Sequence, residues 1–457
     1  MSRRVTENVS NKIHDETEAA SAASILKEKD ANEIDKKTMK GQEIPQDNSQ
    51  LIQEDGSRAS IDMKTKRKRA LSDLRCIVED AIVGDYLLEK PDKSVSPTEA
   101  AMAKGQLKNI TLWGVPLLPS AGHQGTDVVL LKFLKAREFK VQEAFHMLRK
   151  NLQWRREYNT DSILEENLDP DHENFMYLNC KDKEGRPLCY NDFGTLKDKE
   201  LSKKILETEE FYDKFIRLRV QSMEKGVKEL SFKPGGPNTL VHITDLKNSH
   251  PPALKESRLV SKKILMLLQD NYPELIHKNI IINVPFWYYA CLMMSSKLLS
   301  QRTKRKFVFA RPANVTKTLL KYISPENLPV EYGGLYREND EFLPEDRASE
   351  LMIKKNAAGR IQIPVAETGV TVIWDLTVVG WDVGYKEEFI PDDEGSYRVL
   401  LRNEKDKKGG ESQRNSFYIN EPGRIVITID NLSLKKKKVF YRFKAKPTVP
   451  MYIFLKK

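Results

Sequence analysis

A short basic run beside an apolar stretch carries the clearest chemistry in this chain. Residues 301–307, Gln-Arg-Thr-Lys-Arg-Lys-Phe, place one hydroxyl among four cations. They follow residues 284–294, Val-Pro-Phe-Trp-Tyr-Tyr-Ala-Cys-Leu-Met-Met, which are almost entirely apolar. Cations and a hydroxyl can hold phosphate oxygens, whereas an apolar segment can cover acyl chains. The two stretches together therefore predict a site for an amphipathic lipid.

Charge and cysteine content limit the kind of partner and the compartment. The 457 residues carry 76 Lys and Arg against 66 Asp and Glu, a formal net charge of +10. This excess favours an anionic partner, either a membrane surface or a nucleic acid. The four cysteines are dispersed without a CxxC pair, which is typical of a reduced cytosolic protein. The N-terminus shows no signal-peptide core and no apolar run approaches the roughly 18 residues that cross a bilayer. We therefore expect a cytoplasmic protein that associates peripherally with membranes.

The first two of five expected segments are rich in charge. Residues 1–65 contain no aromatic side chain, so they bury too little apolar surface to offset their ordering entropy, and we expect a disordered leader. Residues 66–105 begin with the basic run 66–69 and continue with apolar residues at helical spacing. This pattern predicts an amphipathic helix and a linker. A docking helix is the simplest interpretation, with a nuclear signal or a membrane-surface helix as alternatives.

The other three segments differ in their secondary-structure patterns. Residues 106–160 predict a helical segment, and residues 161–340 alternate strands with helices, as in an α/β domain. Residues 341–457 contain short strands between Gly, Asp and Asn turns, which predicts an all-β sandwich. The fold class is thus multidomain. We expect helices at 207–229, 255–269, 285–299 and 314–322, and sandwich strands at 370–379, 396–401 and 424–429.

Several motifs, in order along the chain, resemble a known family. Residues 131–141, Leu-Lys-Phe-Leu-Lys-Ala-Arg-Glu-Phe-Lys-Val, resemble the helical N-terminal segment of CRAL-TRIO proteins. Residues 182–187, 270–274 and 326–334 resemble the CRAL-TRIO lipid-binding domain, and residues 385–389 and 435–439 resemble a GOLD domain. A charged leader, a CRAL-TRIO module and a GOLD domain are the arrangement of the plant patellins. The resemblance covers residues 106 to 457.

The resemblance implies a set of head-group residues. In the phosphatidylinositol and phosphatidylcholine transfer proteins of this superfamily, a few polar residues hold the inositol phosphate. Their motif carries over to Arg137, Glu274, Thr303 and Lys306. The chemistry agrees, because the cations and the hydroxyl can bind phosphate while the carboxylate accepts from inositol hydroxyls. The alternative is that Arg137 and Glu274 form structural ion pairs and that Thr303 and Lys306 are merely solvated.

The resemblance also implies a pocket for acyl chains behind a gating helix at 285–299. Relatives that bind phosphatidylcholine hold its head group with hydroxyl side chains, which this chain lacks at the matching positions. A buried phosphodiester without donors is costly, so we expect phosphoinositide binding without phosphatidylcholine exchange. His242 is alternatively a core histidine. The expected wall residues are Leu178, Cys189, Leu240 and His242, and the expected gate residues are Phe286, Trp287, Tyr289, Leu292 and Met293.

The C-terminal end predicts a further membrane contact. Residues 435–457 contain nine Lys or Arg and no Asp or Glu. Each cation near an anionic membrane contributes about 1 kcal/mol. We expect a basic patch made of Lys435, Lys436, Lys437 and Lys438. The resemblance adds protein partners bound through the GOLD domain, and a location at the plasma membrane or the cell plate.

Motifs for catalysis are absent. The chain has no GxSxG, HExxH or phosphate-loop sequence, and its seven histidines are dispersed. We therefore expect no enzyme, no metal and no cofactor, only a bound phosphoinositide or another hydrophobic ligand. Nucleic-acid binding is not expected, since no known binding module is present. The expected function is phosphoinositide binding and lipid transfer in membrane trafficking or cell-plate formation. The alternative is an adaptor that senses phosphoinositide and recruits partners through the GOLD domain without net transfer.

Overall fold

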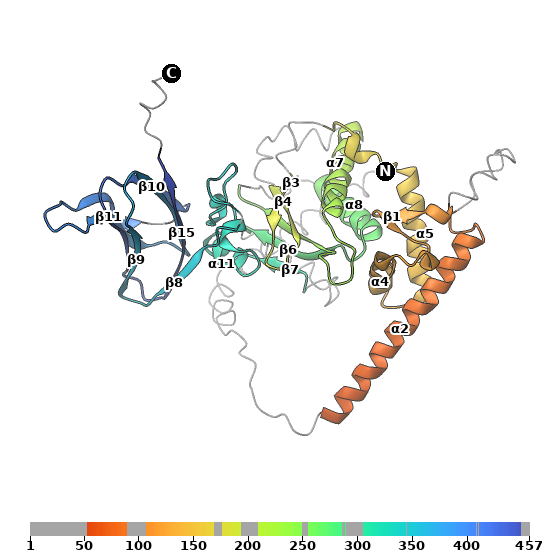
Figure 1. Cartoon of the computed structure of the whole chain (residues 1–457). Helices are drawn as coiled ribbons and strands as arrows, with labels where there is room; N and C mark the ends of the chain where they lie inside the picture. Colours follow the sequence, from red (N-terminus) through yellow and green to blue (C-terminus); the bar gives the residue numbers. More distant parts are fainter. Residues whose placement is uncertain are drawn as a thin grey trace, which may run out of the picture. The chain divides into compact units, whose positions relative to one another are not determined.

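The computed structural model comprises helices, one five-stranded sheet and a β-sandwich (Figure 1). Residues 67–457 belong to one compact unit. The expected gating helix, Thr303 and most of the leader lie outside the described residues. The structure describes residues 53–88, 107–168, 176–192, 209–248, 255–285, 288, 305–343, 345–407, 409 and 411–448.

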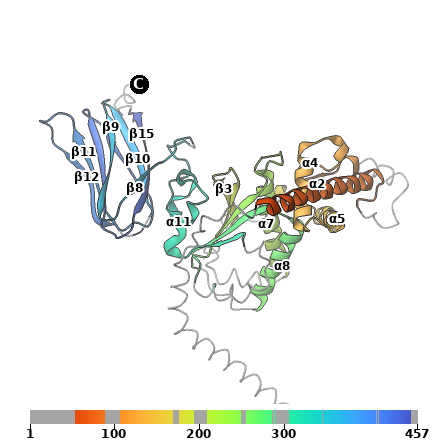
Figure 2. The same ribbon diagram turned by 90° about the horizontal axis from the view of Figure 1, so that it is seen from below.

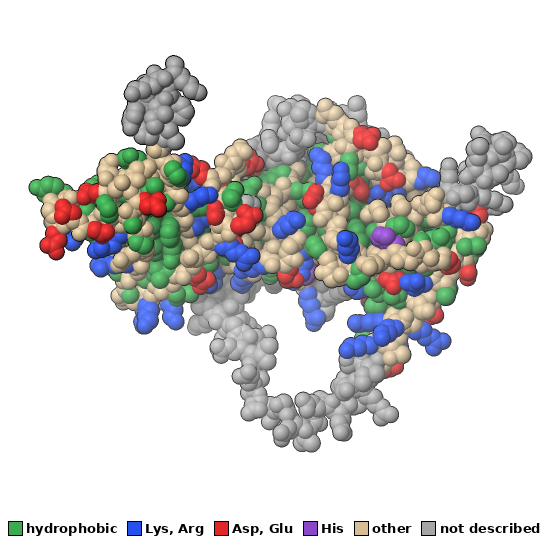
Figure 3. Space-filling model, in the orientation of Figure 1, with side chains coloured by type: hydrophobic (Ala, Val, Ile, Leu, Met, Phe, Trp, Pro, Cys, Tyr) green, Lys and Arg blue, Asp and Glu red, His purple; other side chains and the backbone are tan. Residues whose placement is uncertain are grey.

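Helix α2 (Gln53–Val83) begins inside the segment expected to be disordered. Its buried side chains recur every three or four residues, at Ala70, Leu74, Val78, Ala81 and Ile82. This spacing places them on one face, as a docking helix requires. The basic residues 64–69 stay exposed, and Figure 3 shows Lys and Arg side chains gathered over α2.

Two further helices follow, as expected. They are α4 (Gln124–Ala136) and α5 (Val141–Glu157), joined by a tight turn in which Glu138 and Phe139 have positive φ. Arg75 of α2 holds Asp127 of α4 at 2.5 Å. Before α4, a hairpin of β1 (Thr111–Leu112) and β2 (Val115–Pro116) places Trp113 against Phe133 and Phe232. Short 3₁₀ turns occupy Leu107–Asn109, Pro119–Ala121, Ile163–Glu165, Pro312–Asn314, Pro325–Asn327 and Val330–Tyr332.

The five-stranded sheet confirms the expected α/β domain. Its strand order is β3-β4-β5-β6-β7; β3 and β4 are antiparallel and the other neighbours are parallel. The strands are β3 (Met176–Lys181), β4 (Pro187–Asp192), β5 (Leu240–Asp245), β6 (Ile276–Ile282) and β7 (Phe307–Phe309), and the helices are α7 (Glu209–Lys228), α8 (Lys255–Asn271) and α11 (Val315–Leu319).

The two faces of this sheet are covered by different helices. Helix α11 lies on one side and α7 and α8 on the other (Figures 1 and 2). Val241 and Ile243 of β5 pack with Leu319 of α11. Since side chains alternate along a strand, Leu240 and His242 point to the face of α7.

The C-terminal strands form two antiparallel four-stranded sheets, which confirms the expected all-β domain. The orders are β13-β10-β15-β8 and β12-β11-β14-β9. The core contains Trp374 and Tyr385, both almost fully buried. The strands are β8 (Ser349–Ile353), β9 (Ala357–Val365), β10 (Val370–Val378), β11 (Val383–Pro391), β12 (Val399–Lys407), β13 (Gln413–Tyr418), β14 (Gly423–Asn431) and β15 (Lys437–Pro447).

The strand expected at 396–401 is displaced. Ser396 lies in the turn before β12, where its hydroxyl donates to Glu421 at 2.6 Å. The strand itself runs on to Lys407 through charged residues. An edge strand exposes much of its surface and so tolerates such residues, which is why apolar pattern alone placed it too early.

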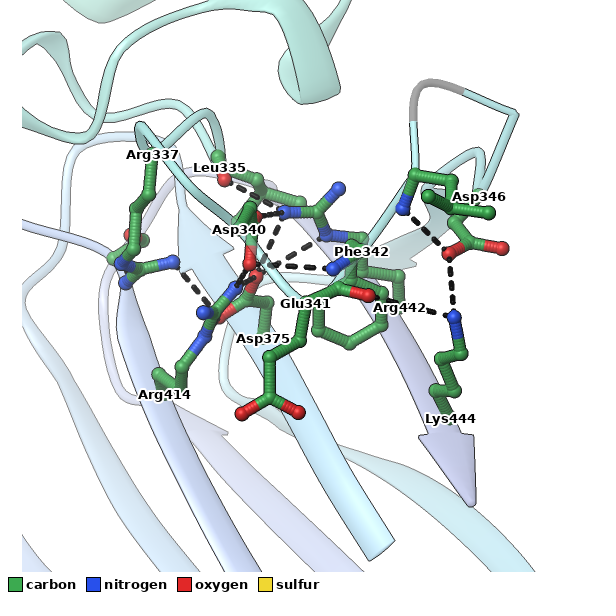
Figure 4. A network of polar contacts seen from close by, with 12 residues as sticks. Leu335, Arg337, Asp340, Glu341, Phe342, Asp346, Asp375, Arg414, Arg442 and Lys444 are labelled. Atoms are coloured by element: carbon green, nitrogen blue, oxygen red, sulfur yellow. Dashed lines mark hydrogen bonds and ion pairs between the residues drawn. The ribbon is translucent and has the colours of Figure 1, made fainter. Parts of the chain in front are cut away.

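A buried ionic network fixes residues 333–342 onto the sandwich (Figure 4). Asp375 of β10 is fully buried and accepts from Arg337 at 2.9 Å, Arg414 at 2.6 and 2.7 Å, and Arg442 at 2.9 and 3.1 Å. Asp340 accepts from Arg414 at 2.6 Å and Arg442 at 2.7 Å. Because each buried carboxylate has several charge-assisted partners, the burial of these charges is compensated.

Candidate functional site

Glu274 and Lys306 meet at the edge of the sheet where β6 and β7 begin. Lys306 Nζ lies 3.1 Å from Glu274 Oε2, and the two side chains are 27% and 21% exposed. Glu274 precedes β6 and Lys306 precedes β7, so the parallel strands bring both to the same edge. The backbone N–H of Asn279 donates to the Lys306 carbonyl at 2.8 Å. Partial exposure leaves this pair accessible to a polar ligand.

A buried lysine lies behind this pair, and the sequence reading did not include it. Lys132 of α4 donates to the Asn238 backbone carbonyl at 2.6 Å, to Asn238 Oδ1 at 3.1 Å and to the Glu274 backbone carbonyl at 3.1 Å. It therefore ties α4 to the loops before β5 and β6. A cation inside the apolar run Leu130-Leu131-Lys132-Phe133-Leu134 was the signal, because a buried ammonium needs acceptors.

Other cations lie close to Lys132. Burial, with smaller contributions from the charges of Lys135 and Lys306, lowers the pKa of Lys132 to about 7 against the opposing effect of Glu274. Desolvation and like charges both disfavour the ammonium form. An anionic group entering beside these residues would relieve their mutual repulsion.

Arg137 stands at the end of α4, where its backbone N–H donates to the Phe133 and Leu134 carbonyls at 3.1 and 3.2 Å. Its side chain is half-buried. Within the described residues no hydrogen bond or ion pair joins its guanidinium to Glu274 or Lys306. The structure thus brings two of the four predicted head-group residues into contact, and the assignment of all four stays a prediction.

Among the predicted wall residues, Cys189, Leu240 and His242 lie on the α7 face of the sheet, and Leu178 pairs with Cys189 in the β3–β4 register. Cys189 pairs with His242 in the β4–β5 register. Cys189 Sγ lies 3.9 Å from Ser222 Oγ of α7. Leu240 is fully buried against α7, where a Cβ added at Gly226 would lie 3.0 Å from it. These contacts make Leu240 part of the packed core, and its role in an acyl pocket stays a prediction.

The fourth wall residue, Leu178, lies on the edge strand β3. It borders a cavity of about 550 Å³ formed with residues 329–331 and 336–338. The predicted gate residues Phe286, Trp287, Tyr289, Leu292 and Met293 are outside the described residues.

An unpaired arginine on the α7 face also escaped the sequence reading. Arg219 Nη1 donates to Asn191 Oδ1 at 2.8 Å, and no carboxylate among the described residues contacts it. Burial lowers the pKa of Arg219. Burial, together with the charge of Arg219, also lowers the pKa of His242 to about 3, and His242 Nε2 has no hydrogen-bond partner in the described part of the chain. His242 is therefore neutral, as expected of a core histidine.

The predicted basic patch needs a correction at Lys437. Its side chain is 9% exposed and its ammonium donates to the carbonyls of Gly380 and Trp381 at 2.5 and 2.6 Å. Lys437 begins β15 and points into the sandwich, so the alternation of the strand removes it from the surface. Lys438 pairs with Glu350 at 2.7 Å. Lys435 and Lys436 are exposed.

The described residues contain no group of three or more His, Cys, Asp or Glu side chains that could hold a metal ion. In the same part of the chain, no helix combines the length and the apolarity needed to span a bilayer.

Three family models match consecutive parts of the chain. The CRAL/TRIO N-terminal domain matches residues 88–150, and the CRAL/TRIO domain matches residues 171–334. The Patellin-1-like C-terminal GOLD domain matches residues 354–438. The order and the fold of these matches agree with the resemblance and with the α/β and all-β architecture described above.

Curated relatives agree with the family models. Patellin-4 of Arabidopsis thaliana is 49% identical over 74% of this chain, and the chain spans only 62% of the length of that relative. Patellin-6 of the same plant is 42% identical over 80% of this chain and 90% of its own length. The phosphatidylinositol transfer protein SFH5 of Kluyveromyces lactis is 29% identical over 46% of this chain and 68% of its own length.

Proposed function

The chain belongs to the patellin family, and from this premise we propose that it binds phosphoinositides and transfers lipid at membrane surfaces without catalysing a reaction. A relative whose name describes it as a phosphatidylinositol transfer protein supports the ligand class. The α/β domain would hold the lipid, and the sandwich would add contacts to the membrane or to protein partners.

One observation carries the proposal. The partly exposed Glu274–Lys306 pair lies at a sheet edge, with the buried Lys132 behind it. Lys306 supplies a compact cation to a phosphate, and Glu274 accepts hydrogen bonds from inositol hydroxyls. Arg137 adds a guanidinium with no carboxylate partner among the described residues, and a planar guanidinium binds phosphate through two parallel hydrogen bonds.

We extend the proposal to the cellular setting. Membership of the patellin family supports a cytoplasmic protein that acts peripherally at the plasma membrane or the cell plate. There it would serve membrane trafficking or cell-plate formation in dividing plant cells. Partners bound through the GOLD domain belong to the same proposal.

The proposal is tested by following lipid occupancy and exchange in the full chain. We expect native mass spectrometry after incubation with phosphoinositide vesicles to show one phosphoinositide per protein. The double change Arg137→Ala with Lys306→Ala should lower occupancy and exchange at least tenfold, because two charge-assisted contacts are lost. Lys150→Ala, which removes an exposed cation of α5, is the matched control and should leave both unchanged.

The outcomes separate the candidate functions. Unchanged exchange by the double variant would refute the assigned head-group residues. Membrane recruitment with one bound phosphoinositide but without exchange between vesicles would instead identify an adaptor. A melting curve for each variant shows whether the ion pair of Glu274 also stabilises the fold.

A further inference from the structure

The connection between β14 and β15 exposes two leucines at one end of the sandwich. We call residues 432–436, Leu-Ser-Leu-Lys-Lys, the leucine loop. Leu432 is 77% exposed and Leu434 is 81% exposed. An isolated exposed apolar residue is normal on a protein surface. Two exposed leucines on one short loop, separated by a single residue, call for a functional explanation.

The conformation of the leucine loop is fixed by hydrogen bonds from its polar residues. The fully buried Asn431 donates to the carbonyls of Lys354 and Lys435 at 2.8 and 2.9 Å. Asn431 Oδ1 accepts from the Ser433 backbone N–H at 3.1 Å and from the Ser433 hydroxyl at 2.7 Å. Asn and Ser side chains that bond the local backbone stabilise tight turns. The loop therefore holds both leucines outward, which reduces the entropy lost when they bind.

Unpaired lysines surround the two leucines. The neighbouring turn between β8 and β9 carries Lys354 and Lys355, and the backbone N–H of Asn356 donates to the Ser433 carbonyl at 3.4 Å. Lys354, Lys355, Lys435 and Lys436 are all exposed. None of these four ammonium groups forms an ion pair within the described part of the sandwich.

Several other lysines of the sandwich are paired with carboxylates. Lys438 pairs with Glu350 at 2.7 Å, Lys446 with Glu341 at 2.6 Å, and Lys407 with Glu404 at 2.9 Å. The four unpaired lysines flank the two exposed leucines, on the leucine loop itself and on the neighbouring turn between β8 and β9, and a surface that combines apolar and basic side chains complements an anionic bilayer.

We propose that the leucine loop inserts Leu432 and Leu434 into the acyl region of an anionic bilayer while Lys354, Lys355, Lys435 and Lys436 bind the lipid head groups. Amphipathic membrane contacts combine apolar burial with attraction to anionic lipid in this way. This surface is separate from the Glu274–Lys306 site. The inference rests on the proposed function in one respect, because that function already gives the sandwich a contact with the membrane.

The test uses the full chain and vesicles that contain no phosphoinositide. Binding is measured by sedimentation with phosphatidylcholine vesicles, with and without phosphatidylserine. Wild type should bind the vesicles with phosphatidylserine. Leu432→Ser with Leu434→Ser should weaken this binding on the order of tenfold or more, since burying a leucine is worth about tenfold in affinity or better. Leu400→Ser, which replaces a leucine that is 56% exposed on β12, is the matched control and should bind as wild type does.

A second pair of variants reports insertion directly. Leu434→Trp should show additional fluorescence quenching by brominated acyl chains, whereas Leu400→Trp should not. Lys435→Gln with Lys436→Gln should weaken binding at low salt and reduce its salt dependence, because screened charges lose their attraction. Salt dependence that remains as in wild type would overturn the role of the lysines.

Two results would contradict the proposed insertion of the leucine loop. Wild-type vesicle binding by the double leucine variant, or absence of quenching of Leu434→Trp on bound vesicles, would overturn the inference. The surface would then suit a protein partner with acidic side chains. Phosphoinositide occupancy, measured by native mass spectrometry, should be unchanged in the leucine variants. A failure of the head-group site and a failure of the leucine loop are therefore distinguishable.

Discussion

The sandwich and the α/β domain treat buried polar groups differently. In the sandwich, the buried Asp375 accepts from three guanidinium groups. The buried Glu387 accepts from Trp374 Nε1 at 2.9 Å, from Asn415 Nδ2 at 2.6 Å and from the Tyr385 hydroxyl. Within the described α/β domain, by contrast, Nε2 of the buried His242 has no partner and Arg219 has no carboxylate neighbour.

This difference distinguishes a structural scaffold, the sandwich, from a candidate binding face, the α7 face of the five-stranded sheet. A buried polar group without a partner costs about 1–3 kcal/mol, so a protein keeps few of them. The buried acidic network of the sandwich is fully paired, although the buried Nε1 of Trp381 in the same domain has no partner among the described residues. On the α7 face of the sheet, where Leu240 and Cys189 were predicted to contact lipid, His242 Nε2 has no partner and Arg219 has no carboxylate neighbour among the described residues. Substitutions at three positions test this comparison.

The largest effect is expected in the sandwich. Asp375→Ala should lower the free energy of unfolding by about 3–5 kcal/mol, because it removes the buried carboxylate that three guanidinium groups share and leaves Asp340 alone to balance them. Chemical denaturation followed by tryptophan fluorescence measures the change. Glu367→Ala, at an exposed acid of the same domain, serves as the control and should change stability by less than about 0.5 kcal/mol. A tolerated loss of Asp375 would show that the network is not a stabilising element.

An intermediate and pH-dependent effect is expected in the α/β domain. The pKa of folded His242 is lowered to about 3 from an ordinary 6.5. Between these values the unfolded state binds a proton that the folded state does not. Stability should therefore fall as the pH drops through this window, by at most about 1.4 kcal/mol per pH unit from this residue. The charge penalty is absent above pH 6.5.

His242→Leu should reduce this loss on acidification and leave stability at neutral pH equal or higher, because an unpartnered polar atom is removed. His242→Gln should also reduce the slope but keep a buried polar group. Denaturant midpoints at about pH 4, inside this window, and at about pH 7, above it, measure the effect of both substitutions. An acid dependence equal to that of wild type in both variants would contradict a buried, neutral His242.

The smallest effect is expected on the sandwich surface. Lys438 and Glu350 form an ion pair at 2.7 Å with side chains 40% and 45% exposed. Lys438→Ala should change the free energy of unfolding by less than about 1 kcal/mol, since solvent screens exposed pairs. A double-mutant cycle with Glu350→Ala isolates the pair. A coupling as large as the effect expected for Asp375→Ala would mean that burial does not explain the contrast between the two networks.

The domain order and most of the helices could be predicted from the amino-acid sequence. Periodic apolar spacing placed α2, α4, α5, α7 and α8, because a helix must bury one stripe of side chains. Alternation and turn residues indicated the sandwich. The position of β12 was missed, since an edge strand can carry charged residues along its length.

Which charges are free to bind could be learned only from the folded structure. A run of four lysines at 435–438 looks uniform in sequence, yet Lys437 is buried against carbonyls and Lys438 is paired, whereas Lys435 and Lys436 remain unpaired. Lys132 likewise becomes part of the candidate site only because Asn238 and Glu274, distant in sequence, supply its acceptors. Whether a charged side chain can bind a ligand depends on its burial and on the partners that other elements supply, and the local sequence pattern shows neither.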